Sequence, residues 1–515
     1  MPSRNMNRAG TLLMVAIAGV AVDGTAAAQV VDPVVFSFAT VGDNRQDPAS
    51  PDPTTLIANP NPTTQGGAPS LTGTLLPQDA MYLQNSTAWS TIQSGIQAQN
   101  PNLLFFNGDM IYGYGRPILP TAWTSLGGPG SWYGEQAIYP DAFFEYLQYA
   151  YWRGTVSTLF SSGTYVMPVP GNHETQCSST AAPYNGTNGA PASNPNCNTK
   201  KQGNLTGKTA YADNENAFRA NMSDLIQDLV TNYRFSNVTG FFPSSPNGLT
   251  AATAPQPGGN NGPITSPQND LTYSFDIVVQ ASPLIQLHFA VIDTDPAGAD
   301  STAPADWLAA DFAAAKARGA SNFFVFGHKP AFTYNYAAAT GGSIAVGGTP
   351  GPSGLDANTT AAGTATINGV SVSYNSGPAS LKAFWSVVTE YGATYFCGHE
   401  HTVNVAQYPD PTGTYAGTPY HVIVGSGGSP FDDKLINTPC TSNALGAAGN
   451  CSEPALTNPF DRYYAWALVQ VHQSGAVTLH VSGFSDQFGV VQDLGEYDVS
   501  SLQLADAAAK TRRKK

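Results

Sequence analysis

The stretch Cys397-Gly398-His399-Glu400-His401 decides how the rest of this chain is interpreted. It follows a short apolar run that begins at Thr394, stops at a glycine and then presents two histidines two positions apart. In an extended segment such side chains share one face, and where the chain turns at a strand end they can diverge toward two metal ions. A single His-x-His pair is weak evidence for a metal site, so the remainder of the chain has to support it.

Four other segments repeat this pattern of an apolar run, a glycine and then a polar side chain. They are FATVGD (38–43), LFFNGD (104–109), VPGNHE (169–174) and FVFGH (324–328). Open α/β sheets bind their ligands at the carboxyl ends of strands, where these polar residues fall. We therefore expect the strand-end side chains to converge: Asp43, Asp109, Asn172, His173, His328, His399 and His401.

This set mixes carboxylate and carboxamide oxygens with imidazole nitrogens. Such a mixture suits zinc, manganese or iron better than an all-oxygen magnesium or calcium cage, and better than a thiolate structural site. The donors are too many for one ion and fit two if one carboxylate bridges. A metal pair about 3.5–4 Å apart can hold phosphoryl oxygens and activate a water for in-line displacement.

Composition excludes some classes of function. Charged residues make up 11 % of the 515 residues, and the formal net charge is −14. Contacts with nucleic-acid phosphates require a basic face, so we expect no binding of nucleic acid. The one basic run lies in the last ten residues, 506–515, which we expect to be a solvated tail.

Residues 1–28 have the pattern of a secretory signal peptide. Arg4 and Arg8 precede an apolar run over 11–22, and Ala26-Ala27-Ala28 provides small residues for cleavage. The alternative is an uncleaved anchor. No later stretch approaches the ~20 apolar residues of a spanning helix, so we expect a soluble mature protein, secreted or periplasmic, without a stable membrane span.

The chain has five cysteines, which suits an oxidising compartment. We expect one disulfide between Cys177 and Cys197 and another between Cys440 and Cys451, because each pair flanks one loop-rich stretch. Cys397 is then left over within an apolar run, and we expect a buried free thiol there.

Hydrophobic periodicity predicts an α/β fold with mixed sheets and helices outside. Strands are expected at 34–41, 103–106, 165–169, 271–279, 284–293, 323–326, 394–397, 420–424, 466–471 and 477–481. Helices are expected at 88–99, 141–160, 216–230, 303–318 and 381–391. The Gly/Pro/Asn-rich stretches at about 175–270 and 336–378 are interpreted as long surface insertions, and residues 336–374 are expected to be loop. Residues 29–505 would then form one catalytic domain, and the chain contains no internal repeat.

The ordered motifs Gly-Asp, Gly-Asp-x-x-Tyr, Gly-Asn-His-Glu, Gly-His and Gly-His-x-His resemble the calcineurin-like metallophosphoesterase superfamily. Within it they are most similar to the purple acid phosphatase pattern, and they extend from residue 43 to residue 401. The resemblance implies a metallophosphoesterase-type β-sandwich of two mixed sheets flanked by helices. It also implies two metal ions at the strand ends, iron together with zinc, manganese or iron.

Carried over position by position, the resemblance implies that Asp109 bridges the two ions. Asp43, Tyr112 and His401 would complete one site, and Asn172, His328 and His399 the other. The alternative for Tyr112 is packing beside the site without ligation. His173 is similar to the family histidine that contacts the phosphoryl group or protonates the leaving group. Glu174 would orient it or, alternatively, serve as a hydrogen-bonded core residue.

Arg45 departs from the superfamily pattern. Many members have a ligating histidine two residues after the first aspartate, and purple acid phosphatases usually have glycine. An arginine stays protonated and cannot bind a cation. We therefore expect Arg45 to bind a phosphate oxygen of the substrate; the alternative is a salt bridge to a nearby carboxylate such as Asp47. Without that histidine the first site depends more on Tyr112, and no second histidine follows His328 closely.

The resemblance implies hydrolysis of small phosphate monoesters by direct attack of a metal-bound hydroxide, without a covalent phosphoenzyme. One alternative is a phosphodiesterase or alkaline-type phosphatase with zinc or manganese, in which Tyr112 does not ligate. Another is a secreted binding or adhesive protein that keeps the fold but not the chemistry; an intact ligand set argues against this because buried carboxylates and imidazoles are costly without a cation. The oligomeric state is left open.

Overall fold

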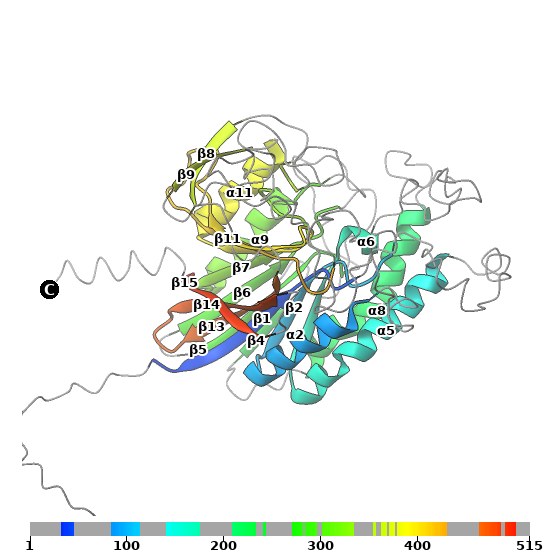
Figure 1. Ribbon diagram of the computed structural model, residues 1–515. Helices are drawn as coiled ribbons and strands as arrows, with labels where there is room; N and C mark the ends of the chain where they lie inside the picture. The colour runs from blue at the N-terminus through cyan, green and yellow to red at the C-terminus, as the bar shows by residue number, and fades with distance from the viewer. Residues whose placement is uncertain are drawn as a thin grey trace, which may run out of the picture.

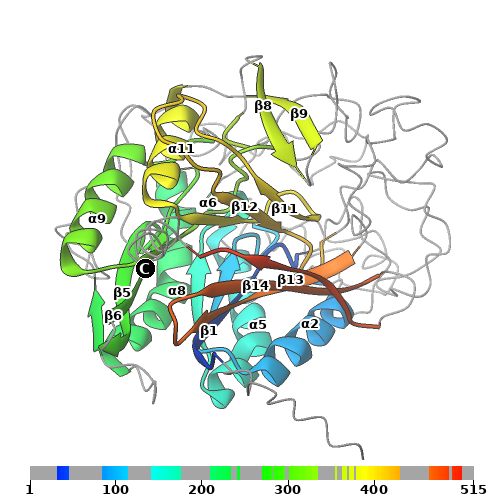
Figure 2. The same ribbon diagram turned by 90° about the vertical axis from the view of Figure 1, so that its left-hand side faces the viewer.

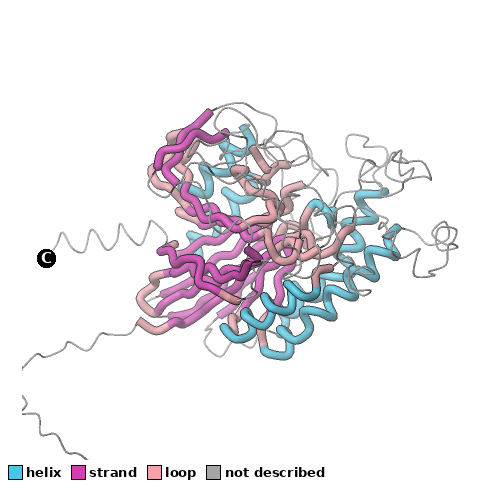
Figure 3. Tube along the Cα trace, in the orientation of Figure 1, coloured by secondary structure: helices cyan, strands magenta, loops and turns pink. Residues whose placement is uncertain are grey.

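The computed structural model describes residues 32–45, 84–113, 141–175, 209–232, 240–243, 270–281, 284–295, 301–333, 354–356, 362–367, 370–375, 379–429, 463–485 and 490–500. Two large sheets face each other, and helices cover their outer faces (Figure 1). Figure 3 shows the same layering, with the strands between helices. The expected sandwich of two mixed sheets is confirmed. The signal peptide, the four cysteines expected to pair and the basic tail lie outside the described residues.

The first sheet has six strands in the order β15-β14-β13-β1-β2-β3. Their bounds are β1 Val34–Val41, β2 Leu103–Asn107, β3 Tyr165–Val169, β13 Tyr463–His472, β14 Val477–Ser485 and β15 Gln492–Asp498. Strands β1, β2 and β3 are parallel, whereas β13 pairs antiparallel with β1. The carboxyl ends of the three parallel strands therefore meet at one edge of the sheet.

The second sheet has seven strands in the order β11-β12-β10-β7-β6-β5-β4. Their bounds are β4 Gly240–Pro243, β5 Tyr273–Ala281, β6 Leu284–Val291, β7 Asn322–Phe326, β10 Thr394–Cys397, β11 Val403–Gln407 and β12 Tyr420–Val424. Strands β6, β7, β10 and β12 are parallel. Backbone bonds join the strand ends of the two sheets, including Gly42 N–H to the Val424 carbonyl at 2.9 Å.

Helices α2 (Ser86–Gln99), α5 (Asp141–Ser162) and α8 (Thr209–Asn232) cover the outer face of the first sheet. Helices α9 (Ala305–Arg318) and α11 (Ala379–Tyr391) cover the second, and Figure 2 shows these two lying together. None of the helices in the described part of the chain is long and apolar enough to cross a bilayer.

The aromatic side chains between the sheets hold together the strands that carry the ligand motifs. The ring of Phe38 on β1 meets five others edge-on, with centroids 5.0–5.9 Å apart: Phe105, Phe289, Phe324, Phe326 and Phe396. Such pairs add about 0.5–1.5 kcal/mol each beyond their burial. Because these strands run directly into the motifs, their packing fixes the separation of the strand ends.

One expectation about the insertions is wrong. Within the low-complexity stretch expected to be loop, β8 (Ala362–Ile367) and β9 (Val370–Asn375) form an antiparallel hairpin. The sequence does contain a hairpin pattern here. Two runs rich in Thr, Val and Ile flank Asn368-Gly369, a pair frequent in hairpin turns. Short strands β4, β11 and β15 were also not expected, and the four-residue helix α6 (Asn172–Thr175) begins inside a motif.

A buried charged network ties β5, β6 and α9 together away from the strand ends. His288 Nδ1 lies 2.6 Å from Asp276 Oδ1, and His288 Nε2 lies 2.9 Å from Asp311 Oδ2. Arg318 Nε also donates to Asp276, at 2.6 Å. Burial opposes charge on His288, but the two carboxylates prevail and raise its pKa to about 9. His288 therefore has a structural role.

We expect the stability of the protein to fall as pH rises from about 6.5 to about 9. The folded-state pKa of His288 is raised, to about 9, above the ordinary 6.5, so its stabilisation is complete below pH 6.5 and is lost as pH rises through 9. The difference corresponds to about 3 kcal/mol. Denaturant unfolding at several pH values should show a smaller decline for His288→Gln than for wild type. Equal declines in the two proteins would contradict a charged His288.

Candidate metal centre

Five of the seven predicted metal ligands stand where a strand of the sandwich ends. Asp43 follows β1, Asp109 follows β2 and Asn172 follows β3, while His328 and His399 follow β7 and β10. All of these strands belong to the parallel parts of the two sheets, so their carboxyl ends meet. Segments more than 350 residues apart in sequence thus contribute to one group, as Asp43 accepting the His399 amide shows (|i−j| = 356).

The backbone at three of these residues is strained. Asp43, Asp109 and His399 have φ of 60°, 54° and 69°, in the left-handed region that non-glycine residues rarely adopt. Such conformations persist only where the surrounding structure imposes them, and they gather at functional sites.

The glycines that precede Asp109 and His399 allow neighbouring ligand residues to come close to the backbone. A Cβ on Gly108 would lie 2.5 Å from His328 Nδ1, and a Cβ on Gly398 would collide with the Asp43 carboxylate. The Gly-Asp and Gly-His motifs therefore have a steric reason in this fold: the ligand turns pack directly against one another.

Asp43, Asp109 and His328 form a buried group that could hold a metal ion. Each offers one ligand atom, and these atoms all lie within 4.8 Å of one another. Two carboxylates and one imidazole in a fully buried place form a donor set that suits a transition-metal cation.

His328 provides the strongest indication that a cation belongs here. Its Nδ1 lies 2.8 Å from the carbonyl oxygen of Asn107, so Nδ1 carries the proton and Nε2 presents a lone pair. That lone pair faces two oxygen acceptors, Asn172 Oδ1 at 2.7 Å and Asp109 Oδ1 at 3.2 Å. The Nδ1 of His399, whose role as donor or acceptor depends on its tautomer, lies 3.2 Å away. Converging lone pairs without protons between them repel one another, and a cation satisfies all of them. The residues therefore fit a metal centre.

His399 and His401 lie on the more accessible side of this group. His399 Nδ1 is 2.9 Å from Asn172 Oδ1, and His401 Nε2 is 3.7 Å from Asp43 Oδ1. His399 is partly buried, whereas His401 is 8 % exposed. Burial, then the neighbouring His328 and Lys329, hold the pKa of His399 well below its ordinary value. A neutral imidazole is the form that binds a metal.

Arg45 forms an ion pair with Asp109. Its Nε lies 3.1 Å from Asp109 Oδ2, and the arginine is 9 % exposed. Burial alone would raise the pKa of Asp109, but His173, His328 and Arg45 hold it well below the ordinary value. Arg45 is the permanently charged one of these three. A salt bridge to a nearby carboxylate is the alternative expected for Arg45, and the carboxylate seen here is that of Asp109. Asp47 lies outside the described residues, and phosphate binding by Arg45 stays a prediction.

His173 and Tyr112 contact each other. His173 Nδ1 bonds to the carbonyl oxygen of Tyr112, and its Nε2 lies 3.6 Å from Asp109 Oδ2. The Tyr112 and His173 rings are 5.6 Å apart at a tilt of 57°. Tyr112 is thus buried beside the group, and ring packing is the role of Tyr112 that these contacts show. Burial, then Arg45, holds the pKa of His173 well below its ordinary value.

Glu174 contacts backbone amides. Its carboxylate accepts from the N–H groups of Asp109, Met110, Ile111 and Gly171 at 2.8–3.2 Å. Burial and the charge of Asp109 raise its pKa to about 8, against these amides. Glu174 fixes the turn after β2, as the hydrogen-bonded core alternative expects, and none of these bonds reaches the His173 ring.

Several residues around the site escaped the sequence motifs. The Asn107 carbonyl orients His328, and Lys329 Nζ binds Asp295 Oδ1 at 2.7 Å directly beside His328. Asp295 follows β6 and lies in none of the motifs. Backbone carbonyls carry no sequence signal, and Lys329 lies in no motif, so only the fold reveals them.

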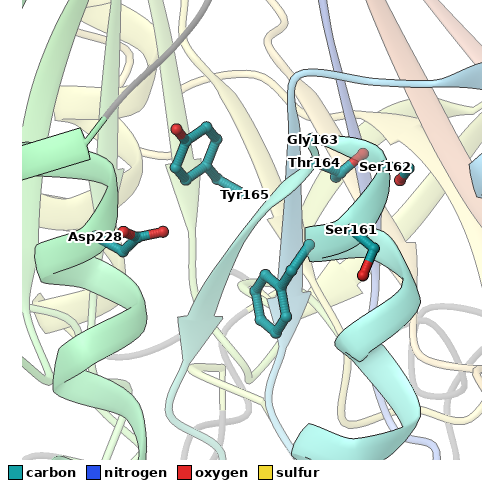
Figure 4. Close-up of a pocket in the computed structure, with 7 residues that line it drawn as sticks. Ser161, Ser162, Gly163, Thr164, Tyr165 and Asp228 are labelled. Carbon is teal, nitrogen blue, oxygen red and sulfur yellow. The ribbon is translucent and has the colours of Figure 1, made fainter.

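A hollow of about 490 Å³ lies at the opposite end of β3 from this centre. It is lined by Phe160, Ser161, Ser162, Gly163, Thr164, Tyr165 and Asp228 (Figure 4). Tyr165 begins β3, whereas Asn172 follows its end. The hollow is therefore separate from the strand-end group.

No protein-family model and no curated protein sequence matches the chain. Similar solved structures include the purple acid phosphatase PPD1 from yellow lupin (Lupinus luteus), with 11 % identity and a TM-score of 0.40 over 90 % of this chain and 53 % of that one. This chain thus spans about half the length of the lupin enzyme. A dimetal phosphatase from Danio rerio has 10 % identity and a TM-score of 0.35, covering 91 % of this chain and 100 % of that one.

A third similar structure is GAP50 of Plasmodium, described as the anchor in the inner membrane complex. It has 11 % identity and a TM-score of 0.33, covering 92 % of this chain and 94 % of that one. Two of these three structures are described as phosphatases. At such identities and TM-scores the similarity carries no argument about activity, which rests on the site itself.

Proposed function

We propose that this chain is a secreted phosphate-ester hydrolase with a dinuclear metal centre, acting on phosphate monoesters in the manner of purple acid phosphatases. The observation that supports it best is the convergence of the Asn172 and Asp109 oxygens on the lone pair of His328 Nε2, at 2.7 and 3.2 Å. The signal-like residues 1–28 support secretion or export to a periplasm.

The ligand assignment follows the motifs and the grouping of the side chains. Asp109 would be the shared ligand. Asp43, Tyr112 and His401 would complete one set, and Asn172, His328 and His399 the other, for iron with zinc, manganese or iron. When bound, the two ions would supply activation of water and neutralisation of phosphoryl charge.

Arg45 binds the substrate phosphate in this proposal. Its guanidinium carries a permanent charge, provides several donors and reaches the group at Asp109. It is among the less buried residues of the site, so a phosphate entering from solvent can meet it. Donors that stand ready around a phosphoryl group stabilise the charge of its equatorial oxygens.

His173 supplies the proton to the leaving group. Because its Nδ1 bonds to the Tyr112 carbonyl, Nε2 is the nitrogen that can exchange a proton. The donor is the doubly protonated imidazole, a form that the negative charge of a bound phosphate favours. As the bond between phosphorus and the ester oxygen breaks, that oxygen takes the proton from Nε2 while a water oxygen forms the new bond to phosphorus. A proton of that water then returns to Nε2. Such assistance contributes about 10²–10⁴-fold in enzymes generally.

A phosphodiesterase or alkaline-type phosphatase with zinc or manganese is the second candidate. The contact between the Tyr112 and His173 rings favours it, since a tyrosine held by ring packing need not ligate iron. The two candidates predict different responses to loss of Arg45, because a monoester dianion carries more charge than a diester.

Arg45→Met should lower kcat/KM for an aryl phosphate monoester by about tenfold or more, the typical value of a hydrogen bond to a charged group. The loss for the matching aryl diester should be smaller. Steady-state rates on both esters, with metal content measured in parallel, check this. Arg153→Met is the matched control, because Arg153 pairs with Asp224, whose side chain is 60 % exposed, on the helical face. Faster hydrolysis of the diester by the wild type would favour the second candidate, and no hydrolysis of either would overturn the proposal.

A further inference from the structure

Side chains hold five successive backbone amides, those of residues 109–113, in the turn that follows β2. Glu174 accepts from Asp109, Met110 and Ile111 at 2.9, 2.8 and 3.2 Å. The next two amides, Tyr112 and Gly113, point to one atom of Gln148, Oε1, at 2.8 and 3.4 Å. Five successive N–H groups are therefore fixed. Three donate to a side chain of α6, and two donate to a side chain of α5.

Gln148 is built into this place. It is 3 % exposed and stands on the 22-residue helix α5, which packs on the first sheet. Because two amide N–H groups point at the same atom, that atom is the carbonyl oxygen of the side chain. Loss of a buried acceptor leaves its donors unsatisfied, which makes the position sensitive.

The peptide that Gln148 holds is also the one that orients His173. The Tyr112 carbonyl accepts from His173 Nδ1, and His173 Nε2 faces Asp109. Gly113, at φ 56°, lies so close to the backbone carbonyl of His173 that a Cβ there would collide with it. A shift of residues 112–113 would therefore rotate or displace the imidazole.

We propose that Gln148 is a positioning residue that aims His173 Nε2 at the leaving oxygen of the substrate, and that the site is thereby built for phosphate esters with poor leaving groups, such as alkyl phosphates. This inference rests on the proposed function. An alkoxide needs a proton as it departs, whereas a dinitrophenolate does not. The aiming of His173 by Gln148 thus matters for the first kind of ester and not for the second.

Gln148→Met removes the acceptor and keeps the length and apolar contacts of the side chain. It should lower kcat for an alkyl phosphate by about tenfold or more, the scale of partners that orient site residues. It should lower kcat for 2,4-dinitrophenyl phosphate less than about threefold, because general acid catalysis assists only leaving groups that need the proton. Gln93→Met is the matched control: Gln93 lies on α2 and also bonds to α5, but at Thr155 and Thr158.

A double-mutant cycle separates positioning from general loosening. In a His173→Ala background, Gln148→Met should cause no further change in the ratio of alkyl to dinitrophenyl turnover. Equal loss on both esters, or the same change of ratio without His173, would overturn the inference.

Proton NMR of the metal-free protein tests the same coupling without turnover. The Nδ1–H of His173 should give a downfield signal that is absent in His173→Gln and retained in Gln93→Met. It should shift or broaden in Gln148→Met, and an unchanged signal would contradict the role of Gln148. If the wild type hydrolyses neither ester, the proposed function fails, while this measurement still decides the positioning role.

Discussion

Asp109→Asn should abolish most hydrolysis of aryl phosphates and leave the centre unable to keep its full metal content. Asp109 is 1 % exposed, and its two oxygens reach His328 at 3.2 Å and Arg45 at 3.1 Å. It is the carboxylate that both ligand sets share in our proposal. Removing a residue that hydrogen-bonds to a metal ligand already lowers metal affinity or activity 10–100-fold. Loss of a ligand that both sets share should therefore lower kcat by more than about 10²-fold.

The matched control for this substitution is Asp224→Asn, because the side chain of Asp224 is 60 % exposed in a surface ion pair. It should keep wild-type kcat and metal content. Denaturant unfolding of both variants without metal shows whether each is folded. Near wild-type turnover in a folded Asp109→Asn protein would contradict the assignment of Asp109 to the hydrolytic site.

Removal of metal should destabilise the folded protein and abolish its hydrolysis of phosphate esters. Without a cation, His328 Nε2 and its facing acceptors on Asp109 and Asn172 repel one another inside the protein. Binding stabilises the folded state by RT ln(1 + [L]/Kd), which is about 4 kcal/mol at free metal 1,000-fold above Kd. Thermal unfolding with and without a chelator should therefore show a marked drop in Tm, reversed when zinc, manganese or iron is restored.

Asp109→Asn provides the control for that shift. With the shared carboxylate neutralised, the chelator should change the Tm of the variant much less than that of the wild type. An identical unfolding curve for wild type with and without chelator, in a protein that still hydrolyses phosphate esters, would contradict a metal-dependent site.

The parts of the fold that the sequence predicts well are those with strong local periodicity. Val34–Val41 and Tyr165–Val169 are strands with the expected bounds, because β-branched and aromatic runs end sharply at Gly42 and Pro170. The hairpin of β8 and β9 was missed because Gly- and Thr-rich surroundings hid its alternation. The order of strands in each sheet depends on long-range pairing, such as β13 beside β1, that no local pattern encodes.

The candidate site divides in the same way. Short motifs identify Asp43, Asp109 and His328, since chemistry requires those side chains in any fold of this type, and the structure groups them. No motif includes Gln148. It lies on helix α5 and accepts from the backbone amide of Tyr112, 36 residues away along the chain. Arg45 is intermediate: its charge indicated an anion partner, but only the fold shows that Asp109 is the carboxylate it pairs with.

Metal analysis of the purified, extensively dialysed protein tests the central claim most directly. Wild type reconstituted with iron and zinc or manganese should retain about two ions per chain, as a dinuclear hydrolytic centre requires, and Asp109→Asn should retain fewer. Retention of no metal by the wild type after reconstitution with each of these ions would contradict a cation-binding centre at the strand ends.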